Sequence, residues 1–281
     1  MKEFLRKFKI ARWFAKNTRI GKILVQTDGN WRCIFMFVPW TFVKILVPRK
    51  KVLVDGFEIS LSRSNWITYT RWLYYKKKEV EVRNYINTYV KDGDVFFDVG
   101  ANIGVFSLFA GKKYDNISVY SFEPEHSNIG ILKENIFYNN LLKKVTPFSV
   151  AISDSIGLSK LHIQDFTPGA AVHTESQSDI EITEEGYEVV WAEGIATVTL
   201  DYVCEQLDII PNTIKIDTDG HEDKVLRGAK ATLSNQALRS IVIEMPHEDE
   251  KTEYCVHLLK QAGFSLVWSD PEKTRNEIWE K

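Results

Sequence analysis

A chain of 281 residues with 44% hydrophobic and 12% aromatic residues can bury a full core, which excludes disorder as its main state. Its cysteines, Cys33, Cys204 and Cys255, are far apart and form no CxxC pair, which fits a reducing, cytoplasmic compartment. The net charge of −2 hides an asymmetry, because residues 1–51 carry thirteen basic and two acidic side chains, a local net charge of +11. We therefore expect this basic region to have an anionic partner of its own.

The N-terminal extension, residues 1–50, combines basic charge with amphipathic patterning. If residues 2–16 are helical, their apolar side chains gather on one face and their lysines and arginines on the other. Two interpretations stay open: the helix binds an anionic membrane surface, at the inner face of the membrane, or it packs on the rest of the chain. The apolar run from Cys33 to Val47 is interrupted by a proline and a lysine, and it is shorter than the roughly 20 residues of a bilayer crossing. We expect no signal peptide, since no unbroken apolar core follows the basic start.

Residues 51–90 form a second segment, in which strand-like alternation is followed by a helical pattern. Asp55-Gly56 is a two-residue turn signal, so we predict a β-hairpin over about 51–62. A helix over about 68–90 follows it, and the two together are expected to cap the main domain.

Residues 91–281 form the main domain, in which apolar runs alternate with amphipathic segments of helix length. The predicted strands lie near 95–99, 117–122, 145–150, 213–217 and 241–245. The predicted helices lie near 103–112, 127–140, 221–235 and 249–262. Repeated strand, helix, strand order implies right-handed crossovers, so the expected fold class is α/β, Rossmann-like and doubly wound, with a mainly parallel sheet.

Two segments depart from this alternation. Residues 155–200 contain the strand-like runs "GLSKLHIQ" and "ATVTLD" with a polar, acidic stretch between them, so we predict an insertion of antiparallel strands and loop. The tail contains "GFSLVWSD" and "NEIWEK" around Asp270-Pro271, which predicts a terminal antiparallel pair.

A glycine turn follows the first predicted strand of the main domain. The sequence "DVFFDVGANIG" ends a strand at Asp98-Val99 and opens a helix through Gly100, Ala101, Asn102 and Gly104. In open α/β sheets, ligands bind at the carboxyl ends of the strands, and glycines there allow close approach of backbone N–H groups. We therefore predict that this turn binds a cofactor.

The turn differs from a dinucleotide-binding loop. Asn102 stands where the second glycine of G-x-G-x-x-G makes room for a pyrophosphate, and Asp98 adds a negative charge that repels one. A cationic ligand without phosphate fits better, and S-adenosyl-L-methionine, with its sulfonium and ammonium groups, is such a ligand. We predict it as the cofactor.

The next two strands offer further cofactor contacts. Glu123, followed by Pro124, ends the second strand 19 residues after Gly104, close to the spacing of a ribose-binding acid. Ser153 and Asp154 end the third strand, where they would face the adenine edge; a turn-forming role is the alternative.

Five motifs follow one another along the main domain. They are "FFDVGANIGVFSL" (96–108), "VYSFEPEHSN" (119–128), "TVTLDYV" (197–203), "IKIDTDGHEDKVLRGA" (214–229) and "IVIEMP" (241–246). In this order and spacing they resemble the FkbM type of class I S-adenosylmethionine-dependent methyltransferases, over about residues 79–281. The resemblance implies a seven-stranded sheet with an antiparallel last strand. Thr218 and Asp219 depart from it, since many members have valine and glutamate there.

Titratable side chains cluster after the fourth strand of the main domain. The sequence "KIDTDGHE" brings Asp217, Asp219, His221 and Glu222 into one strand-to-helix turn, and Glu244 ends the fifth strand at the same sheet edge. Transfer to a hydroxyl needs a group that removes a proton, so we predict catalytic roles here. Asp217 is the first candidate to face the methyl group or the acceptor, His221 is a candidate base, and Glu222 is expected to orient the site.

Three further residues are weaker candidates. Glu79 lies in the segment that, by the resemblance, covers the cofactor, and a surface acid paired with lysines is the alternative. His173 lies in the insertion, the expected acceptor loop, and is a second candidate base. His247 is expected to be solvated, and we predict no metal.

The sequence thus predicts an O-methyltransferase that modifies a hydroxyl-bearing small molecule or glycan. A sugar in a glycan, glycolipid or secondary metabolite is the expected acceptor, as the resemblance implies. The alternative is a membrane-associated binding or assembly protein that keeps the fold without turnover. No nucleic-acid partner is expected, because no aromatic-basic groove is evident and the body is acidic.

Overall fold

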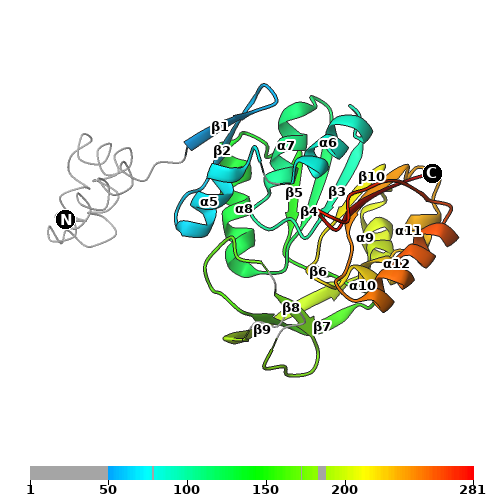
Figure 1. Ribbon diagram of the computed structural model, residues 1–281. Coiled ribbons are helices and arrows are strands. Elements are labelled where there is room, and N and C mark those ends of the chain that lie inside the picture. The colour runs from blue at the N-terminus through cyan, green and yellow to red at the C-terminus, as the bar shows by residue number, and fades with distance from the viewer. Residues whose placement is uncertain (1–49, 78, 172, 183–187) are drawn as a thin grey trace, which may run out of the picture. The chain divides into compact units, whose positions relative to one another are not determined.

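A computed structural model describes residues 50–281 apart from 78, 172 and 183–187 (Figure 1). The predictions for the N-terminal extension, including its membrane contact, fall outside the described residues. Within the described part of the chain, no helix is both long and apolar enough to cross a bilayer.

The main domain is built on a seven-stranded sheet with the strand order β12-β13-β11-β10-β3-β4-β5. The bounds are β3 Val95–Val99, β4 Ser118–Phe122, β5 Val145–Phe148, β10 Thr213–Ile216, β11 Ser240–Glu244, β12 Ser265–Ser269 and β13 Asn276–Glu280. All neighbours are parallel except β13, which is antiparallel to both β11 and β12. The chain order reverses between β3 and β10, so the switch point of the sheet lies between these two strands.

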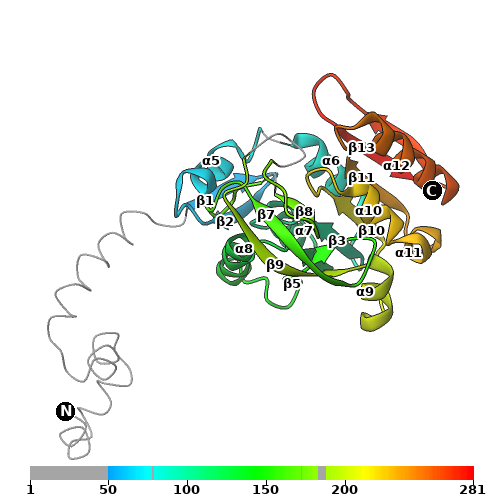
Figure 2. The same cartoon turned by 90° about the horizontal axis from the view of Figure 1, so that it is seen from below.

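Helices cover both faces of this sheet (Figures 1 and 2). Their bounds are α6 Val80–Tyr89, α7 Val105–Lys113 and α8 His126–Tyr138 on one face, and α9 Leu200–Leu207, α10 Glu222–Arg227, α11 Lys230–Ser234 and α12 Asp249–Gln261 on the other. Side chains alternate along each strand, so Phe96 packs in the first core and Phe97 in the second. This confirms the predicted α/β, doubly wound fold class.

A hairpin and a separate helix precede the sheet. Strands β1 Lys50–Val54 and β2 Phe57–Leu61 pair antiparallel around the predicted Asp55-Gly56 turn. The single helix predicted over 68–90 is wrong, because α5 Trp66–Tyr74 ends well before α6 begins. Arg83 donates to the carbonyl oxygens of Tyr75 and Lys76, at 2.7 Å each, and so satisfies acceptors that a continuous helix would have used.

The insertion folds into a small sheet of its own, with the order β6-β9-β7-β8. It contains β6 Ala151–Ile152, β7 Gly157–Ile163, β8 Thr174–Ser176 and β9 Trp191–Val198. The predicted strand 145–150 is the shorter β5, which ends at Phe148, whereas β6 follows it, just before the insertion, and joins the small sheet. The predicted helix 221–235 is the two helices α10 and α11. Gly228 separates them, and a Cβ atom there would lie 2.1 Å from the Ser153 carbonyl oxygen.

Candidate active site

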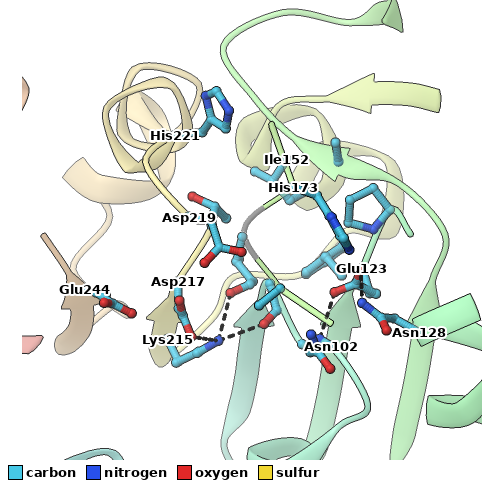
Figure 3. A pocket seen from close by; sticks show the side chains of 18 of the residues that line it. Asn102, Glu123, Asn128, Ile152, His173, Lys215, Asp217, Asp219, His221 and Glu244 are labelled. Carbon is cyan, nitrogen blue, oxygen red and sulfur yellow. Dashed lines mark hydrogen bonds and ion pairs between the residues drawn. The ribbon is translucent and has the colours of Figure 1, made fainter. Parts of the chain in front are cut away.

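A cavity of about 390 Å3 opens at the carboxyl ends of β3, β4 and β10, where the chain order reverses. Such a size and place are typical of small-molecule sites in α/β sheets. Figure 3 shows Asp217, Asp219 and Glu244 on one side of the cavity and Glu123, Asn102 and Asn128 on the other.

The glycine turn borders the cavity, but its glycines are needed mainly for packing. Gly100 has φ +73°, and a Cβ atom on it would lie 1.7 Å from the carbonyl oxygen of Asp217. Gly104 has φ +86°, and a Cβ atom there would lie 2.2 Å from Leu132 Cδ1. The Gly100 and Ala101 amides both donate to the Phe122 carbonyl, at 3.0 Å each. The turn is thus held tightly against β4 and β10, with Gly100, Ala101 and Asn102 on the cavity wall.

Asp98 does not line the cavity, which corrects its predicted contact with a cationic ligand. Its side chain is fully buried on the α7 face of β3. One carboxylate oxygen accepts from the hydroxyl and the amide of Ser107, and the other lies 3.5 Å from Lys215 Nζ. The alternation of side chains along β3 turns Asp98 toward α7, so it fixes the helix that follows the glycine turn through its contacts with Ser107.

Lys215 is a cavity residue that the sequence analysis missed. Its side chain is 3% exposed, and its ammonium lies 3.1 Å from an Asp217 carboxylate oxygen and donates to the Gly100 carbonyl at 2.8 Å (Figure 3). Burial opposes its charge, but the carboxylates of Asp217 and Asp98 outweigh burial and raise its pKa. The available signal was a lysine inside the apolar strand "TIKI", two residues before Asp217 and hence on the same side of the strand.

Asp217 and Glu244 form a carboxyl pair. Their side chains lie at the neighbouring ends of β10 and β11, and each shifts the pKa of the other. Burial disfavours the Asp217 charge, yet the Lys215 ammonium lowers the pKa of Asp217. Burial and the negative charge of Asp217 raise the pKa of Glu244 to about 9, even though Arg275 donates to it at 2.8 Å. The two carboxyl groups therefore titrate as a pair, in which Asp217 is the more acidic partner.

Glu123 closes the other side of the cavity. Its Oε2 accepts from the Asn102 amide at 2.8 Å, and its Oε1 accepts from the Glu125 amide at 3.0 Å and from Asn128 Nδ2 at 3.4 Å. Burial raises the pKa of Glu123 to about 7. The neighbouring Pro124 also lines the cavity. Glu123 thus ties the glycine turn to β4 and still presents a carboxyl group to the cavity.

Ser153 and Asp154 do not line the cavity, contrary to their predicted adenine contact. Strand β6 ends at Ile152, and Asp154 lies 3.3 Å from Arg227 on the α10 side. The cavity wall here is made instead by the three residues before them, Val150, Ala151 and Ile152.

His221 and Glu222 support the turn after β10. His221 Nε2 accepts from the Glu175 amide at 3.0 Å, and burial, helped by the Lys224 charge, lowers the pKa of His221 to about 4. Its lone pair is thus already used, which argues against the predicted role as base. Glu222 Oε1 accepts from the amide and hydroxyl of Thr218, at 2.7 and 2.9 Å. Glu222 thus holds Thr218 in the turn but does not line the cavity, and its expected role in orienting the site stays a prediction.

The remaining candidates, Glu79, His173, Asp219 and His247, all lie on the cavity wall. Burial lowers the pKa of His173, which is close to fully buried. His247 lies at the rim and contacts Arg275. In the part of the chain that the structure describes, no group of three His, Cys, Asp or Glu side chains is arranged to hold a metal ion.

A segment of the insertion, Thr167–Ala171, closes the cavity opposite the sheet; we call it the strap. Its carbonyl oxygens accept from α5 and its cap, at Pro168 from Asn65 Nδ2 (2.9 Å) and at Gly169 from Arg71 Nε (2.8 Å). The Ala170 carbonyl accepts from Asn102 Nδ2 at 2.7 Å. Helix α5, the strap and the glycine turn are thereby joined around the cavity.

The sheet order, the antiparallel β13 and the cavity at the switch point together define a Rossmann-like class I methyltransferase fold. The family model described as "Methyltransferase FkbM domain" matches residues 98–266. The chain therefore belongs to the FkbM methyltransferase family, as its motifs predict, and it is a methyltransferase.

Several relatives share this chemistry. The chain is 28% identical to the 31-O-demethyl-FK506 methyltransferase FkbM of Streptomyces tacrolimicus, over 63% of this chain and 75% of that one. It is also 28% identical to the hexuronic acid methyltransferase AglP of Haloferax volcanii, over 62% of this chain and 65% of that one. A crystal structure of a methyltransferase FkbM from Methylobacillus flagellatus matches with 15% identity and a TM-score of 0.48, over 76% of this chain and 53% of that one.

Proposed function

We propose that this protein transfers a methyl group from S-adenosylmethionine to a hydroxyl group, in a sugar of a glycan, glycolipid or secondary metabolite. The observation that carries the proposal is the Asp217–Glu244 carboxyl pair, which faces a cavity at the switch point of the sheet. The named relatives support the acceptor class, since one acts on a derivative of FK506 and another on hexuronic acid.

The cavity wall fits a cationic, phosphate-free donor. Even with Glu244 protonated, its other acidic residues, Glu79, Glu123, Glu175, Asp217 and Asp219, outnumber its cations, Arg71, Lys215 and Arg275. These acids supply the negative charge that the sequence analysis assigned to Asp98. The donor, when bound, supplies the activated methyl group.

Glu123 and the apolar wall would hold the nucleoside part of this donor. An ionised carboxylate offers about four lone-pair positions, and three protein donors already use some of them at Glu123. One of these bonds is long, so the carboxylate retains room for about one ribose hydroxyl. Phe122, Pro124 and Ile152 offer apolar surface beside it.

Asp217 is placed to accept the proton that the acceptor hydroxyl loses. The lowered pKa keeps Asp217 ionised at neutral pH, and Lys215 fixes its position. Glu244, the less acidic partner, ends the neighbouring strand β11 and is held by Arg275. The donor would supply the methyl group and keep the electron pair of its sulfur–methyl bond as a neutral thioether. The Asp217 carboxylate accepts the proton that the acceptor hydroxyl loses as its oxygen takes the methyl group, and then releases that proton to water.

The insertion supplies the acceptor side of this arrangement. His173 and Glu175 from the insertion line the cavity together with the strap residues Ala170 and Ala171. We propose that residues 155–200 select the acceptor, since they form the wall that is not part of the sheet.

The test separates donor binding from turnover. Asp217→Asn should bind S-adenosylmethionine in calorimetry but lose methyl transfer to cell-envelope glycans by about 100-fold or more, the usual contribution of a general base. Asp154→Asn is the matched control, because this aspartate lies outside the cavity. The methylated product should resist mild alkali, as an ether does and a methyl ester does not. Full activity in Asp217→Asn, or an alkali-labile product, would contradict the proposal.

A further inference from the structure

A shallow groove continues outward from the cavity along helix α5. It has a volume of about 410 Å3 and is lined by Ile67, Thr70, Arg71, Tyr74 and Lys77. The first four share one helical face, since they are spaced by three, one and three residues. Arg71 lines both the cavity and the groove, so it stands at their junction.

Arg71 is positioned to bind an anion at this junction. Its Nε donates to the Gly169 carbonyl at 2.8 Å, which fixes the plane of the guanidinium. Within the described residues, its two terminal nitrogens make no hydrogen bond or ion pair, although its charge helps to lower the pKa of Asp217. The two other cavity cations are already engaged, Lys215 by two carboxylates and Arg275 by Glu244. A fixed guanidinium edge with two donors matches the geometry of a carboxylate or phosphate.

The rest of the groove suits a charged sugar. Lys77 adds a second cation, and no acidic side chain is among its lining residues. Tyr74 is 51% exposed and offers a ring face on which a sugar can stack. The Thr70 hydroxyl donates to the Ile67 carbonyl at 2.8 Å, so its oxygen stays able to accept a sugar hydroxyl.

We propose that this groove is an acceptor subsite, and that the acceptor carries an oxyanion, a carboxylate or a phosphate, which Arg71 and Lys77 bind. The inference rests on the proposed function and adds the charge of the acceptor to it. The anion would lie on the groove side of Arg71, whose charge also acts on Asp217, so the hydroxyl to be methylated is held between the bound anion and the Asp217 carboxylate.

The experiment compares sugars that differ in charge. We would measure binding of 4-nitrophenyl glucuronide, 4-nitrophenyl glucoside and glucose 1-phosphate by calorimetry, with the protein saturated with S-adenosylhomocysteine. The glucuronide or the phosphate should bind about 10-fold or more tighter than the glucoside, as charge-assisted hydrogen bonds predict. Whichever anion is preferred identifies the source of the charge.

Three variants locate the preference. Arg71→Gln should reduce the preference for the anionic sugar over the glucoside to under about 3-fold. Lys77→Gln should reduce this preference by a smaller factor, and it leaves the Arg71 contact with the strap intact. Lys76→Gln is the control, because this exposed lysine lies beside the groove but outside its lining. Equal binding of all three sugars, no binding of any, or an equal effect of Lys76→Gln would overturn the inference. If the parent protein does not bind S-adenosylhomocysteine at all, the proposed function is overturned instead.

Discussion

Replacing Lys215 with methionine tests whether the buried charges form one unit. Lys215 is 3% exposed, and its ion-pair partners are Asp98, which is fully buried, and Asp217, which is 28% exposed. Lys215→Met keeps the length of the side chain but removes the ammonium. Asp98 then keeps only its Ser107 partner, and its second carboxylate oxygen faces no cation.

The expected loss of stability follows from that burial. Removing one partner of a buried ion pair costs about 3–5 kcal/mol, because the other charge stays in a poorly solvated site. For a domain of this size, 1 kcal/mol shifts the melting temperature by roughly 2–4 °C, so the midpoint should fall by about 6–20 °C. The double variant Lys215→Met, Asp98→Asn removes the stranded charge and should recover a large part of this loss.

Thermal and urea unfolding of the parent, both single variants and the double variant complete this cycle. A coupling energy of about 1 kcal/mol or more between the two positions supports the ion-pair account. If the two single effects simply add, Lys215 and Asp98 act independently and the reasoning is refuted. S-adenosylmethionine binding, measured in parallel, should weaken in Lys215→Met because the Gly100 carbonyl loses its donor.

Two further predictions concern the turns beside the cavity. Gly100→Ala should lower the free energy of unfolding by about 3 kcal/mol or more, because its Cβ atom would overlap the Asp217 carbonyl. Gly263 also has positive φ but open space around it, so Gly263→Ala should lower the free energy of unfolding by about 1 kcal/mol. If both variants lose the same free energy of unfolding in urea, the positive φ alone explains the loss and the overlap with Asp217 does not contribute. For His221, the pKa is lowered to about 4, below the ordinary value near 6.5, so the unfolded chain binds a proton that the folded chain rejects. Stability should therefore fall as pH drops from about 6.5 toward 4, and His221→Gln should flatten that loss in urea titrations while still accepting from Glu175.

Sequence patterning predicted the main sheet well, because its strands are short apolar runs between clear turn signals. The strand expected at 95–99 is the observed β3, and the terminal antiparallel pair is β12 and β13. Patterning failed where tertiary contacts decide. Helix α9 was not predicted, because "TVTLD" alternates like a strand; the Thr199 hydroxyl accepts from the Tyr202 amide at 3.0 Å and starts the helix there.

The sequence predicted which strand ends carry the site residues, but not always the face of the sheet to which each side chain points. Asp98 and Glu123 both follow apolar runs at the same sheet edge, yet Asp98 points to α7 and Glu123 to the cavity. One position along a strand reverses the direction of a side chain, and the sequence does not state which residue is the last in the strand. The same rule, applied from Asp217 backwards, would have found Lys215.

The donor turn and the candidate base are built as one structure. The Gly100 carbonyl accepts from Lys215, the Lys215 ammonium pairs with the Asp217 carboxylate, and the Asp217 carbonyl occupies the space where a Gly100 side chain would stand. A shift of either strand end would therefore displace both the turn and the carboxyl pair. The proposed function needs the glycine turn and Asp217 aligned to within a fraction of an ångström, and these three contacts hold the two relative to each other. Substitutions at Gly100, Lys215 and the Asp217 side chain should for this reason be non-additive in turnover.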